Sequence, residues 1–463
     1  MRQADIKSLP AVLNTVCSRI SDCGGRAWLV GGSVRDILLG HTPKDFDLEI
    51  YGLDADQLMT AVHKLGRCQE VGKQFGVIKL WTEGMEIDLA LPRTERKNGA
   101  GHRAFDVRSD PWLDEKTASE RRDFTINAMM LDPLTGDLLD FHGGRLDLEA
   151  GILRHVSPAF AEDPLRPLRA MQFAARFRLT LDPATAELCR KLLAEADTLP
   201  TARIWEEWRK WAHADSPSSG LDVLQASGWL SLYPQLEALI GCEQEEEWHP
   251  EGDVWTHTKL VLDAAAAIAT RYGWSGKMRE IFMFAALCHD LGKPPTTFRH
   301  ENGRIRSTGH AEAGIEPSLS FLGNICVPQQ LIQHILPLVR EHLVHLHGQP
   351  TPRAVRRLAH RLQPAHIEMW EALVEADASG RPPLPAERPA LAWLEQAQEM
   401  AVQITAPEAL ANGEMLIEIG LAPGPAMGKL LDAAYQAQLD GEFSDTAGAS
   451  LWLSRHLPKI RAG

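Results

Sequence analysis

The residues best suited to chemistry lie between positions 29 and 48, which read LVGGSVRDILLGHTPKDFDL. Asp45 and Asp47 are two apart in an expected strand, so both carboxylates point to one face. Gly31 and Gly32 lack side chains, so phosphate oxygens can approach the backbone N–H groups of the helix expected to follow them. Carboxylates beside such a phosphate cradle suit Mg²⁺. This stretch predicts transfer of a nucleotidyl group from a triphosphate through two metal ions.

A third carboxylate is expected in the strand MEIDLAL, where Glu86 and Asp88 share one face. Such a group lowers the pKa of the attacking hydroxyl and positions it. Asp88 is the first candidate for this role and Glu86 the second. The alternative is a salt bridge from these carboxylates to Arg93 or Arg96.

The segment ERRDFTINAMM contains Arg122, Asp123 and Asn127, which are spaced so that they can share one end of a helix. An arginine suits triphosphate oxygens, and an aspartate or asparagine suits ribose hydroxyls. The alternative is a capped helix with a surface ion pair.

The segment EDPLRPLRAMQFAARFR predicts a helix with Pro164 in its first turn and Asp163 at or near the N-cap. Asp163, Arg166 and Arg169 recur every three residues, so we expect them along one face. An Asp–Arg pair complements the hydrogen-bonding edge of cytosine or adenine and opposes that of uracil or guanine. The alternative is an ion pair on the helix surface.

The elements that must position these groups follow from the hydrophobic pattern. Residues 1–150 alternate strand-like and helical stretches, which predicts an α/β head. Helical periodicity then predicts a neck over 151–238 and a histidine-rich helical domain over 239–384, with a polar loop at 294–308. A proline-rich run precedes a helical tail over 385–463, in which LIEIGLAPGPAMGKLLDAAYQAQL predicts helix, turn and helix.

The charge of the 463-residue chain, −14, argues against broad, nonspecific nucleic-acid binding. Basic residues nevertheless cluster locally, and these are candidate contacts with RNA: Arg166, Arg169, Arg176 and Arg178, then Arg353, Arg356, Arg357 and Arg361. The acidic run EQEEE at 243–247 is expected on a solvated face away from RNA.

Apolar runs fall short of the ~20 residues of a membrane span, and the N-terminal segment lacks the apolar core of a signal peptide. The seven cysteines are scattered without a CxxC pair. This pattern argues against a zinc ribbon or a disulfide framework and predicts a protein of the cytoplasm.

Six ordered motifs within residues 26–310 together resemble those of class II tRNA nucleotidyltransferases of the bacterial CCA-adding type. They are LVGGSVRDILLG, KDFDLEIYG, IDLALPRTERK, RRDFTINAM, LRHVSPAFAEDPLRPLRAMQFAARF, and HPEGDVWTHT with CHDLGKP. The resemblance implies a polymerase-β-like mixed sheet with helices in the head, followed by a largely α-helical neck, HD domain and tail. It implies template-independent addition of CMP, CMP and AMP to a tRNA 3′ end from CTP and ATP, with release of pyrophosphate.

By position, the resemblance implies that Asp45 and Asp47 bind Mg²⁺, that Asp163 and Arg166 read the base, and that Arg169 supports them. The candidate nucleotide-binding residues are Gly31, Gly32, Ser33, Arg35, Arg122, Asp123, Asn127, Asp163, Arg166 and Arg169. Family members often have arginine where this chain has Gln172, which predicts a lost positive charge near the nucleotide.

Bacterial poly(A) polymerases share this head and neck. Their arginine-rich run before the third-carboxylate strand is absent here, where the chain reads GKQFGVIKLW, and this favours CCA or A addition. The alternatives are an A-adding enzyme or a poly(A) polymerase and, from another class, an HD phosphohydrolase whose head only binds nucleotide or RNA.

His257, the His289–Asp290 pair and Asp377 fit the H…HD…D order of HD phosphohydrolases. Mixed nitrogen and oxygen ligands suit Ni²⁺, Mn²⁺ or Fe²⁺, with Mg²⁺ as an alternative. His310 is a candidate further ligand or phosphate donor, and His342 and His345 are weaker candidates. In CCA-adding enzymes such a domain is linked to phosphatase and 2′,3′-cyclic phosphodiesterase activity, which predicts a possible role in RNA end repair.

Overall fold

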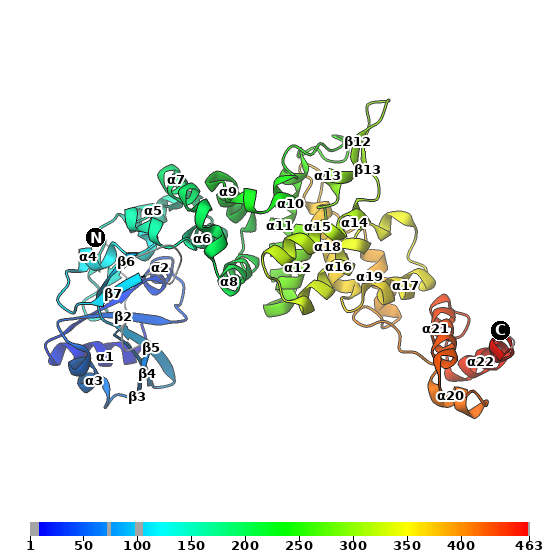
Figure 1. Cartoon of the computed structure of the whole chain (residues 1–463), viewed down its shortest axis with the longest axis horizontal. Helices are drawn as coiled ribbons and strands as arrows, with labels where there is room; N and C mark the ends of the chain where they lie inside the picture. Colours follow the sequence, from blue (N-terminus) through cyan, green and yellow to red (C-terminus); the bar gives the residue numbers. More distant parts are fainter. Residues whose placement is uncertain (1–8, 72–75, 98–104, 462–463) are drawn as a thin grey trace. The chain divides into compact units, whose positions relative to one another are not determined.

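The computed structural model describes residues 9–71, 76–97 and 105–461. The chain divides into two compact units, Met1–Leu232 and Tyr233–Gly463 (Figure 1). Part of the GKQFGVIKLW segment, residues 72–75, lies outside the described residues.

The head is built on a mixed β-sheet. Among the described residues it has seven strands in the order β3-β4-β5-β2-β1-β8-β9. The strands are β1 (Arg26–Val30), β2 (Phe46–Tyr51), β3 (Arg67–Val71), β4 (Val77–Thr82), β5 (Met85–Ala90), β8 (Met130–Leu131) and β9 (Leu138–Leu139). β2 is antiparallel to β1 and parallel to β5, with Asp47 opposite both Val30 and Asp88. This register aligns the glycine pair, Asp47 and Asp88 across three neighbouring strands.

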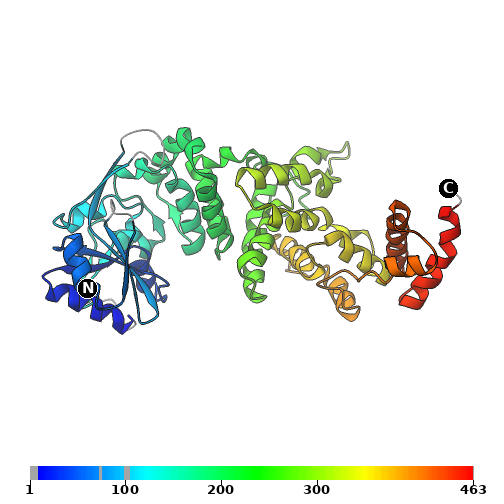
Figure 2. The ribbon, with the colours of Figure 1, turned by 60° about the horizontal axis from the view of Figure 1, so that its bottom comes forward.

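Helices α1 (Ala11–Asp22) and α3 (Ala55–Val62) cover one face of this sheet (Figures 1 and 2). Their apolar side chains share a core with alternate strand residues such as Leu29, Leu48 and Leu89. On the other face of the sheet, a smaller hydrophobic cluster includes Trp28, Tyr51 and Ala118, the last of which lies on α4 (Glu115–Ser119). The expected α/β head is confirmed. Its other elements are α2 (Gly32–Leu38), the hairpin of β6 (Arg93–Lys97) and β7 (Phe105–Ser109), and the 3₁₀ helix η2 (Thr125–Asn127).

The helical region that follows the head packs largely around α6 (Arg166–Phe177), which is buried along most of its length up to Ala175. Helices α8 (Thr201–Ala212) and α9 (Pro217–Ser227) pack against α6, with Trp208 and Trp211 fully buried. The remaining elements are α5 (Gly144–Ala150), β10 (Ile152–Leu153), η3 (Pro158–Glu162), β11 (Thr180–Leu181), α7 (Pro183–Lys191), η4 (Leu192–Thr198) and η5 (Trp229–Leu232).

The second unit is a helical bundle. Helix α12 (Gly276–Cys288) is buried from Arg279 to its last residue and packs against α11 (Val254–Arg271), α16 (Gln329–Glu341) and α18 (Ile367–Ser379). The expected polar loop at 294–308 instead contains a hairpin of β12 (Thr297–Arg299) and β13 (Ile305–Ser307). The shorter elements are α10 (Pro234–Glu237), α13 (Lys293–Thr296), α14 (His310–Ala313), α15 (Ile315–Asn324), η6 (Val344–His347), α17 (Pro352–Leu362) and α19 (Leu391–Glu399).

The tail forms α20 (Gly413–Glu418), a turn, α21 (Pro425–Asp440) and α22 (Thr446–Arg461), as its pattern predicted for the first two helices. Arg353 and Arg357 of α17 both pair with Asp440, and Arg356 donates to the Leu439 carbonyl. These three arginines therefore hold α21 against α17, while Arg361 pairs with Glu341 of α16 at 3.0 Å. Contact of this cluster with RNA stays a prediction. Among the described residues, no helix combines the length and hydropathy that crossing a membrane requires.

Candidate functional sites

The glycine pair forms a turn between β1 and α2. Gly31 has φ = +74°, a left-handed conformation that favours glycine. A Cβ atom at this position would lie 3.6 Å from Arg122 Nη1 and 3.8 Å from Asp47 Oδ2, so the turn brings the backbone close to both groups. The Ser33 hydroxyl donates to the Val30 carbonyl. Its side chain therefore closes the turn, and its contact with nucleotide stays a prediction for its backbone N–H group.

Three carboxylates lie at the edge of this turn. Asp47 and Asp88 are opposite each other on parallel strands, and Asp45 precedes β2. Burial and the neighbouring Asp88 raise the pKa of Asp47, which is the electrostatic signature of carboxylates that share space for a cation. Lys79, which the sequence analysis did not name, pairs with Asp88 at 3.1 Å and also with Glu86. The Arg96 side chain lies outside the described residues.

Glu49 is a candidate positioning residue that the sequence analysis did not single out. It is 1% exposed on β2, and its Oε2 accepts hydrogen bonds from Arg122 at 2.7 Å and from Arg121 at 3.2 Å. Its Oε1 accepts from the Tyr51 hydroxyl at 2.9 Å. The only available signal is that Glu49 follows Asp47 by two residues on a strand.

Asp123 connects the head to α6. Its Oδ1 accepts from Asn127 Nδ2 at 3.1 Å, and its Oδ2 accepts two hydrogen bonds from Arg169. Asn127 Oδ1 accepts in turn from Arg35 at 2.7 Å. Burial alone would raise the pKa of Asp123, but Arg169, Asn127 and Arg166 hold it below its ordinary value. The expectation that Arg122, Asp123 and Asn127 share a helix end is wrong, because Phe124 is extended and only a 3₁₀ turn follows.

Asp163 and Arg166 lie at the start of α6, where the helix begins later than expected. Leu165 is the N-cap, so Asp163 precedes the helix, and its Oδ1 accepts from the Leu165 backbone N–H. Asp163 pairs with Arg203 of α8 at 3.2 Å, a partner that the sequence did not indicate. Arg166 is buried and donates to the carbonyls of Ala159 and Arg121.

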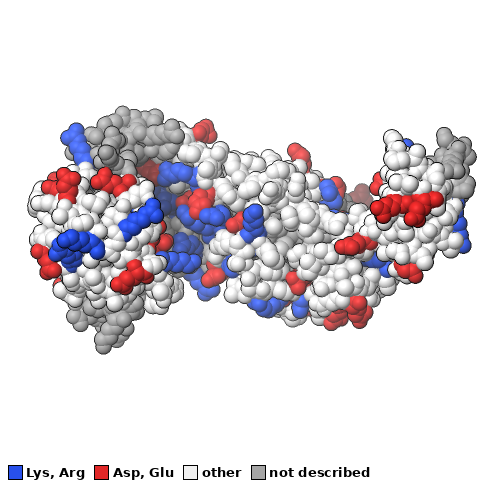
Figure 3. All heavy atoms as spheres, turned by 90° about the horizontal axis from the view of Figure 1, so that it is seen from below, with Lys and Arg blue, Asp and Glu red and all other residues white. Residues whose placement is uncertain are grey.

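These groups surround one pocket of about 510 Å³ in the first unit. Its lining is Gly31, Gly32, Arg35, Asp47, Arg93, Arg121, Arg122, Asp123, Asn127, Asp163, Arg166, Arg169, Phe173 and Arg176. Lys and Arg side chains gather around a hollow near the head in the space-filling view (Figure 3). Gln172 is buried and accepts from Arg176, which lines the pocket. It therefore supports an arginine of the pocket, and the effect of the missing positive charge at this position stays a prediction.

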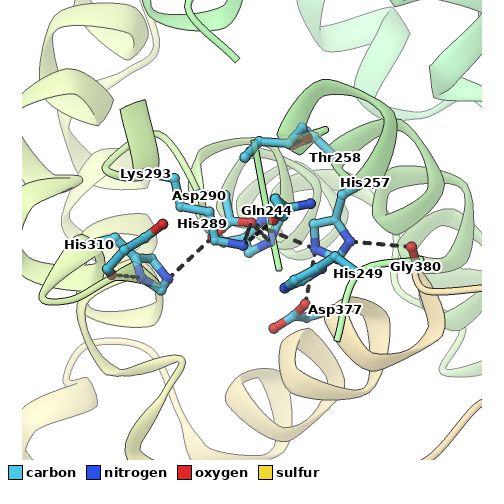
Figure 4. A network of polar contacts seen from close by, with 12 residues as sticks. Gln244, His249, His257, Thr258, His289, Asp290, Lys293, His310, Asp377 and Gly380 are labelled. Carbon is cyan, nitrogen blue, oxygen red and sulfur yellow. Dashed lines mark hydrogen bonds and ion pairs between the residues drawn. The ribbon is translucent and has the colours of Figure 1, made fainter. Parts of the chain in front are cut away.

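The second unit gathers histidines and aspartates from five helices (Figure 4). His257 lies on α11, His289 caps α12, His310 begins α14, His342 caps α16 and Asp377 lies on α18. Asp290 follows His289 directly. The structure thus brings together all four of the expected metal-site residues, with His310 and His342 beside them.

Glu251 and His249 extend this cluster, although the sequence analysis assigned them no role. Glu251 Oε1 lies 2.7 Å from His257 Nδ1 and 2.9 Å from His249 Nδ1. Burial opposes ionisation of Glu251, but its two histidine partners hold its pKa at about 2. Burial would lower the pKa of His257, and Asp377 and Glu251 outweigh it and raise the pKa to about 9. Burial lowers the pKa of His342 to about 3.

A pocket of about 570 Å³ opens onto this cluster, with Asp290, Lys293, His310 and Asp377 in its wall. Exposed apolar side chains, Trp248 and Leu346, form part of the same lining. Glu245 also lines it and accepts from the Ile305 backbone N–H. The acidic run at 243–247 therefore lies partly at this pocket, which corrects the expectation of a merely solvated face.

Three protein families match successive parts of the chain. Residues 27–154 match the poly A polymerase head domain, residues 178–240 match the "probable RNA and SrmB-binding site of polymerase A", and residues 254–374 match the HD domain. The fold and the first pocket accordingly define a nucleotidyltransferase head joined to an HD domain, two classes of domain that generally use divalent metal ions.

The relatives specify the family. A multifunctional CCA protein of Xanthomonas campestris is 36% identical over 431 residues, covering 89% of this chain and 98% of the relative. The chain belongs to the family of multifunctional CCA proteins. Its fold is that of CCA-adding enzymes: the Bacillus stearothermophilus enzyme in complex with CTP matches with a TM-score of 0.65 at 20% identity, covering 98% of each chain. The Thermotoga maritima enzyme complexed with tRNA-CCA matches with a TM-score of 0.59 at 20% identity, covering 98% of this chain and 97% of that one.

Proposed function

We propose that the chain adds C, C and A to the 3′ end of tRNA from CTP and ATP and releases pyrophosphate. The observation that carries this proposal is the pocket of the first unit, which combines the glycine turn, Asp47, several arginines and the Asp163–Arg166 segment. The names of its relatives and the CTP and tRNA bound by its structural neighbours support the same activity.

In this proposal the head residues have distinct roles. Mg²⁺ held by Asp45 and Asp47 would supply charge stabilisation to the triphosphate and acidify the attacking 3′-hydroxyl. Asp88, opposite Asp47, positions that hydroxyl. Arg122, held by Glu49, contacts triphosphate oxygens, while Asp123 and Asn127 face the ribose and Arg35 supports Asn127.

Base selection is assigned to Asp163 and Arg166. Each carboxylate oxygen accepts more than one hydrogen bond, so Asp163 retains acceptor capacity beside Leu165 and Arg203 for the exocyclic amine of cytosine or adenine. Uracil and guanine place a carbonyl there, and each polar group left unpaired in a dry pocket costs ~1–3 kcal/mol. Arg169 positions this segment through Asp123.

The test supplies tRNA lacking CCA, tRNA ending in CC and an unrelated RNA with each labelled triphosphate, with Asp45→Ala/Asp47→Ala as the inactive control. CMP incorporation only into the first RNA, followed by AMP, is the expected result. AMP addition to CC ends alone would instead establish an A-adding enzyme. Long A tracts on any RNA would establish a poly(A) polymerase, and no incorporation would leave the HD domain as the only enzyme.

We propose a second activity for the HD domain: metal-dependent hydrolysis of phosphomonoesters or 2′,3′-cyclic phosphates at RNA ends. The buried histidine–aspartate cluster beside a pocket supports it. Ni²⁺, Mn²⁺, Fe²⁺ and Mg²⁺ are the candidate ions. Phosphate release should be lost in His289→Ala/Asp290→Ala and retained in the head control Asp45→Ala/Asp47→Ala. Absence of turnover with all four ions would overturn this proposal.

The proposed domain ranges are a head over 1–150, a neck over 151–238, an HD domain over 239–384 and a tail over 385–463. The family matches at 27–154, 178–240 and 254–374 support this order. We also propose that the protein acts in the cytoplasm, a location that its seven free cysteines and its tRNA substrate favour.

A further inference from the structure

The pocket of about 570 Å³ beside the histidine–aspartate cluster has a wall to which no role has yet been assigned. Its volume is typical of a site for a small molecule. The wall includes the apolar side chains Trp248, Leu343, Leu346 and Pro389 and the cations Lys293 and Arg381. A ligand complementary to this wall combines a flat or apolar part with an anionic group.

Arg381 is the cation of this wall that is available to an anion. Its Nε atom is buried and lacks a hydrogen-bond partner among the residues that the structure describes. Lys293, in contrast, donates to Gln244 Oε1 at 2.7 Å and pairs with Asp290 at 2.7 Å. A buried donor without an acceptor is unfavourable, and the forked N–H groups of an arginine match the oxygens of a phosphate. Both considerations favour Arg381 as a phosphate-binding side chain.

The chain holds Arg381 close to the cluster. Arg381 follows Gly380, the C-cap of α18, whose carbonyl oxygen lies 3.2 Å from His257 Nδ1. Asp377 lies in the last turn of the same helix, and Asp377 and Arg381 line the same pocket. A phosphate bound by Arg381 would therefore lie in the pocket onto which the cluster opens.

Trp248 presents an aromatic surface to the same pocket. Its side chain is 59% exposed, although tryptophan is on average highly buried. The backbone N–H groups of Trp248 and His249 both donate to the Glu245 carbonyl, at 3.0 Å and 2.9 Å, so a tight turn holds this position. Leu346, which is 66% exposed, lines the pocket as well. Exposed apolar side chains in a pocket that also contains Arg381 suit a nucleobase, because bases stack on aromatic rings.

We propose that this wall binds the 3′-terminal nucleotide of an RNA, with the nucleobase on Trp248 and Leu346 and the terminal phosphate on Arg381. The inference deepens the proposed hydrolysis at RNA ends and rests on it. A terminal nucleotide carries its base and its phosphate on one ribose, so a single pocket can hold both groups. Trp248 then gives the site a preference for nucleotides over phosphate esters that lack a base.

The test measures binding of two phosphonates, which cannot release phosphate, to the Mn²⁺-loaded full chain carrying Asp45→Ala/Asp47→Ala in the head. One is a 3′-phosphonate analogue of adenosine, and the other is the same ribose phosphonate without the base. In isothermal titration calorimetry, Trp248→Ala should weaken binding of the adenosine analogue roughly 5- to 150-fold, equivalent to ~1–3 kcal/mol, and leave the base-free compound unchanged. Trp248→Phe should retain most of the affinity. Trp112→Ala is the matched control, because this tryptophan is 73% exposed in the head.

Arg381→Met should weaken binding of both phosphonates roughly 10-fold or more, because it removes hydrogen bonds to a charged group and keeps an unbranched apolar side chain. Arg306→Met on β13 is the matched control, because Arg306 is exposed and does not line the pocket. The alternative role for Arg381 is an ion pair with Glu387, which lines the same pocket. In that case Glu387→Gln should weaken binding as much as Arg381→Met does.

Unchanged affinity in Arg381→Met, or an equal loss in Glu387→Gln, would overturn the assignment of the phosphate to Arg381. Unchanged affinity in Trp248→Ala, or equal losses for the two phosphonates, would overturn the assignment of the base. Binding of the phosphonates does not depend on turnover. Base-dependent binding without phosphate release from RNA ends would therefore contradict the hydrolase function and leave the nucleotide site intact.

Discussion

Replacement of Glu49 by glutamine tests how the triphosphate-binding arginines are held. The substitution keeps the size of the buried side chain but removes its charge and one acceptor oxygen. Glu49 Oε2 accepts from Arg122 at 2.7 Å and from Arg121 at 3.2 Å, so the shorter contact, to Arg122, dominates the effect. The Tyr51 hydroxyl can rotate to accept from the new amide, which leaves a neutral carbonyl facing the arginines.

The expected magnitude follows from the loss of charge assistance. Hydrogen bonds to charged groups contribute ~1.5–3 kcal/mol and neutral ones ~0.5–1.5 kcal/mol, so the difference is ~1–1.5 kcal/mol. At ~1.36 kcal/mol for each factor of ten, kcat/KM should fall roughly 5- to 10-fold. The fall should be equal for CTP and ATP and lie mainly in KM, because Arg122 is assigned to the triphosphate and not to the base.

The assay measures CMP addition to tRNA lacking CCA and AMP addition to tRNA ending in CC, each over a range of triphosphate concentrations. Glu70→Gln is the control, because it makes the same charge change at an exposed position on β3 of the same sheet. In a double-mutant cycle with Arg122→Ala, the two losses should be less than additive. Unchanged kinetics of Glu49→Gln, a loss confined to one base, or full additivity would refute the reasoning.

Three further predictions concern both units. Asp88→Asn should lower kcat for nucleotide addition ~10²–10⁴-fold with little change in KM for CTP, and an unchanged kcat would exclude it as the hydroxyl-positioning group. Gly31→Ala should destabilise the head by ~1–2 kcal/mol, because φ at this position is +74°. The same change should raise KM for both triphosphates, because the new Cβ would lie beside Arg122. Thermal unfolding measures the first effect and triphosphate titration the second. In chelator-treated protein, the pKa of His257 is raised from 6.5 to about 9, so its protonated form stabilises the second unit by up to ~3 kcal/mol. This stabilisation should be complete below pH 6.5 and should be lost progressively as the pH rises through 9. Thermal unfolding that does not change between pH 6.5 and 9 would contradict the ion pairing of this histidine.

Local patterns were sufficient to predict the α/β character of the head and the helical character of the second unit. The alternation in the strands around Asp47 and Asp88 depends only on near neighbours, and the structure places these two residues opposite each other. The glycine turn was also predictable, because few residues other than glycine adopt the φ of Gly31. The family resemblance, drawn from ordered motifs, is confirmed by the relatives, whereas the catalytic roles of the individual residues remain predictions.

Partners distant in the chain were not predictable from spacing. Glu49 meets Arg122 from another part of the head, and Asp163 meets Arg203 on another helix. A helical interpretation of the Arg122–Asn127 segment failed because Phe124 forms an isolated β-bridge with His155, which holds the chain extended where a helix would have to continue. Hydrophobic periodicity indicates that a residue is buried, but it does not indicate which charged side chain that residue will contact.

The HD cluster shows how a helix end can orient candidate metal ligands. His289 and His342 are the C-caps of α12 and α16, and each donates from Nδ1 to the carbonyl three residues earlier in its own helix. The last carbonyls of a helix have no partner within it, so they are available to accept from such a ring. These backbone carbonyls thus favour the tautomer with the hydrogen on Nδ1 in both rings. His257 differs, because its Nδ1 also depends on the Glu251 carboxylate. Glu251, together with the Gly380 carbonyl at 3.2 Å, therefore orients this candidate metal-binding ring, so that here a side chain contributes what a helix end provides for His289 and His342.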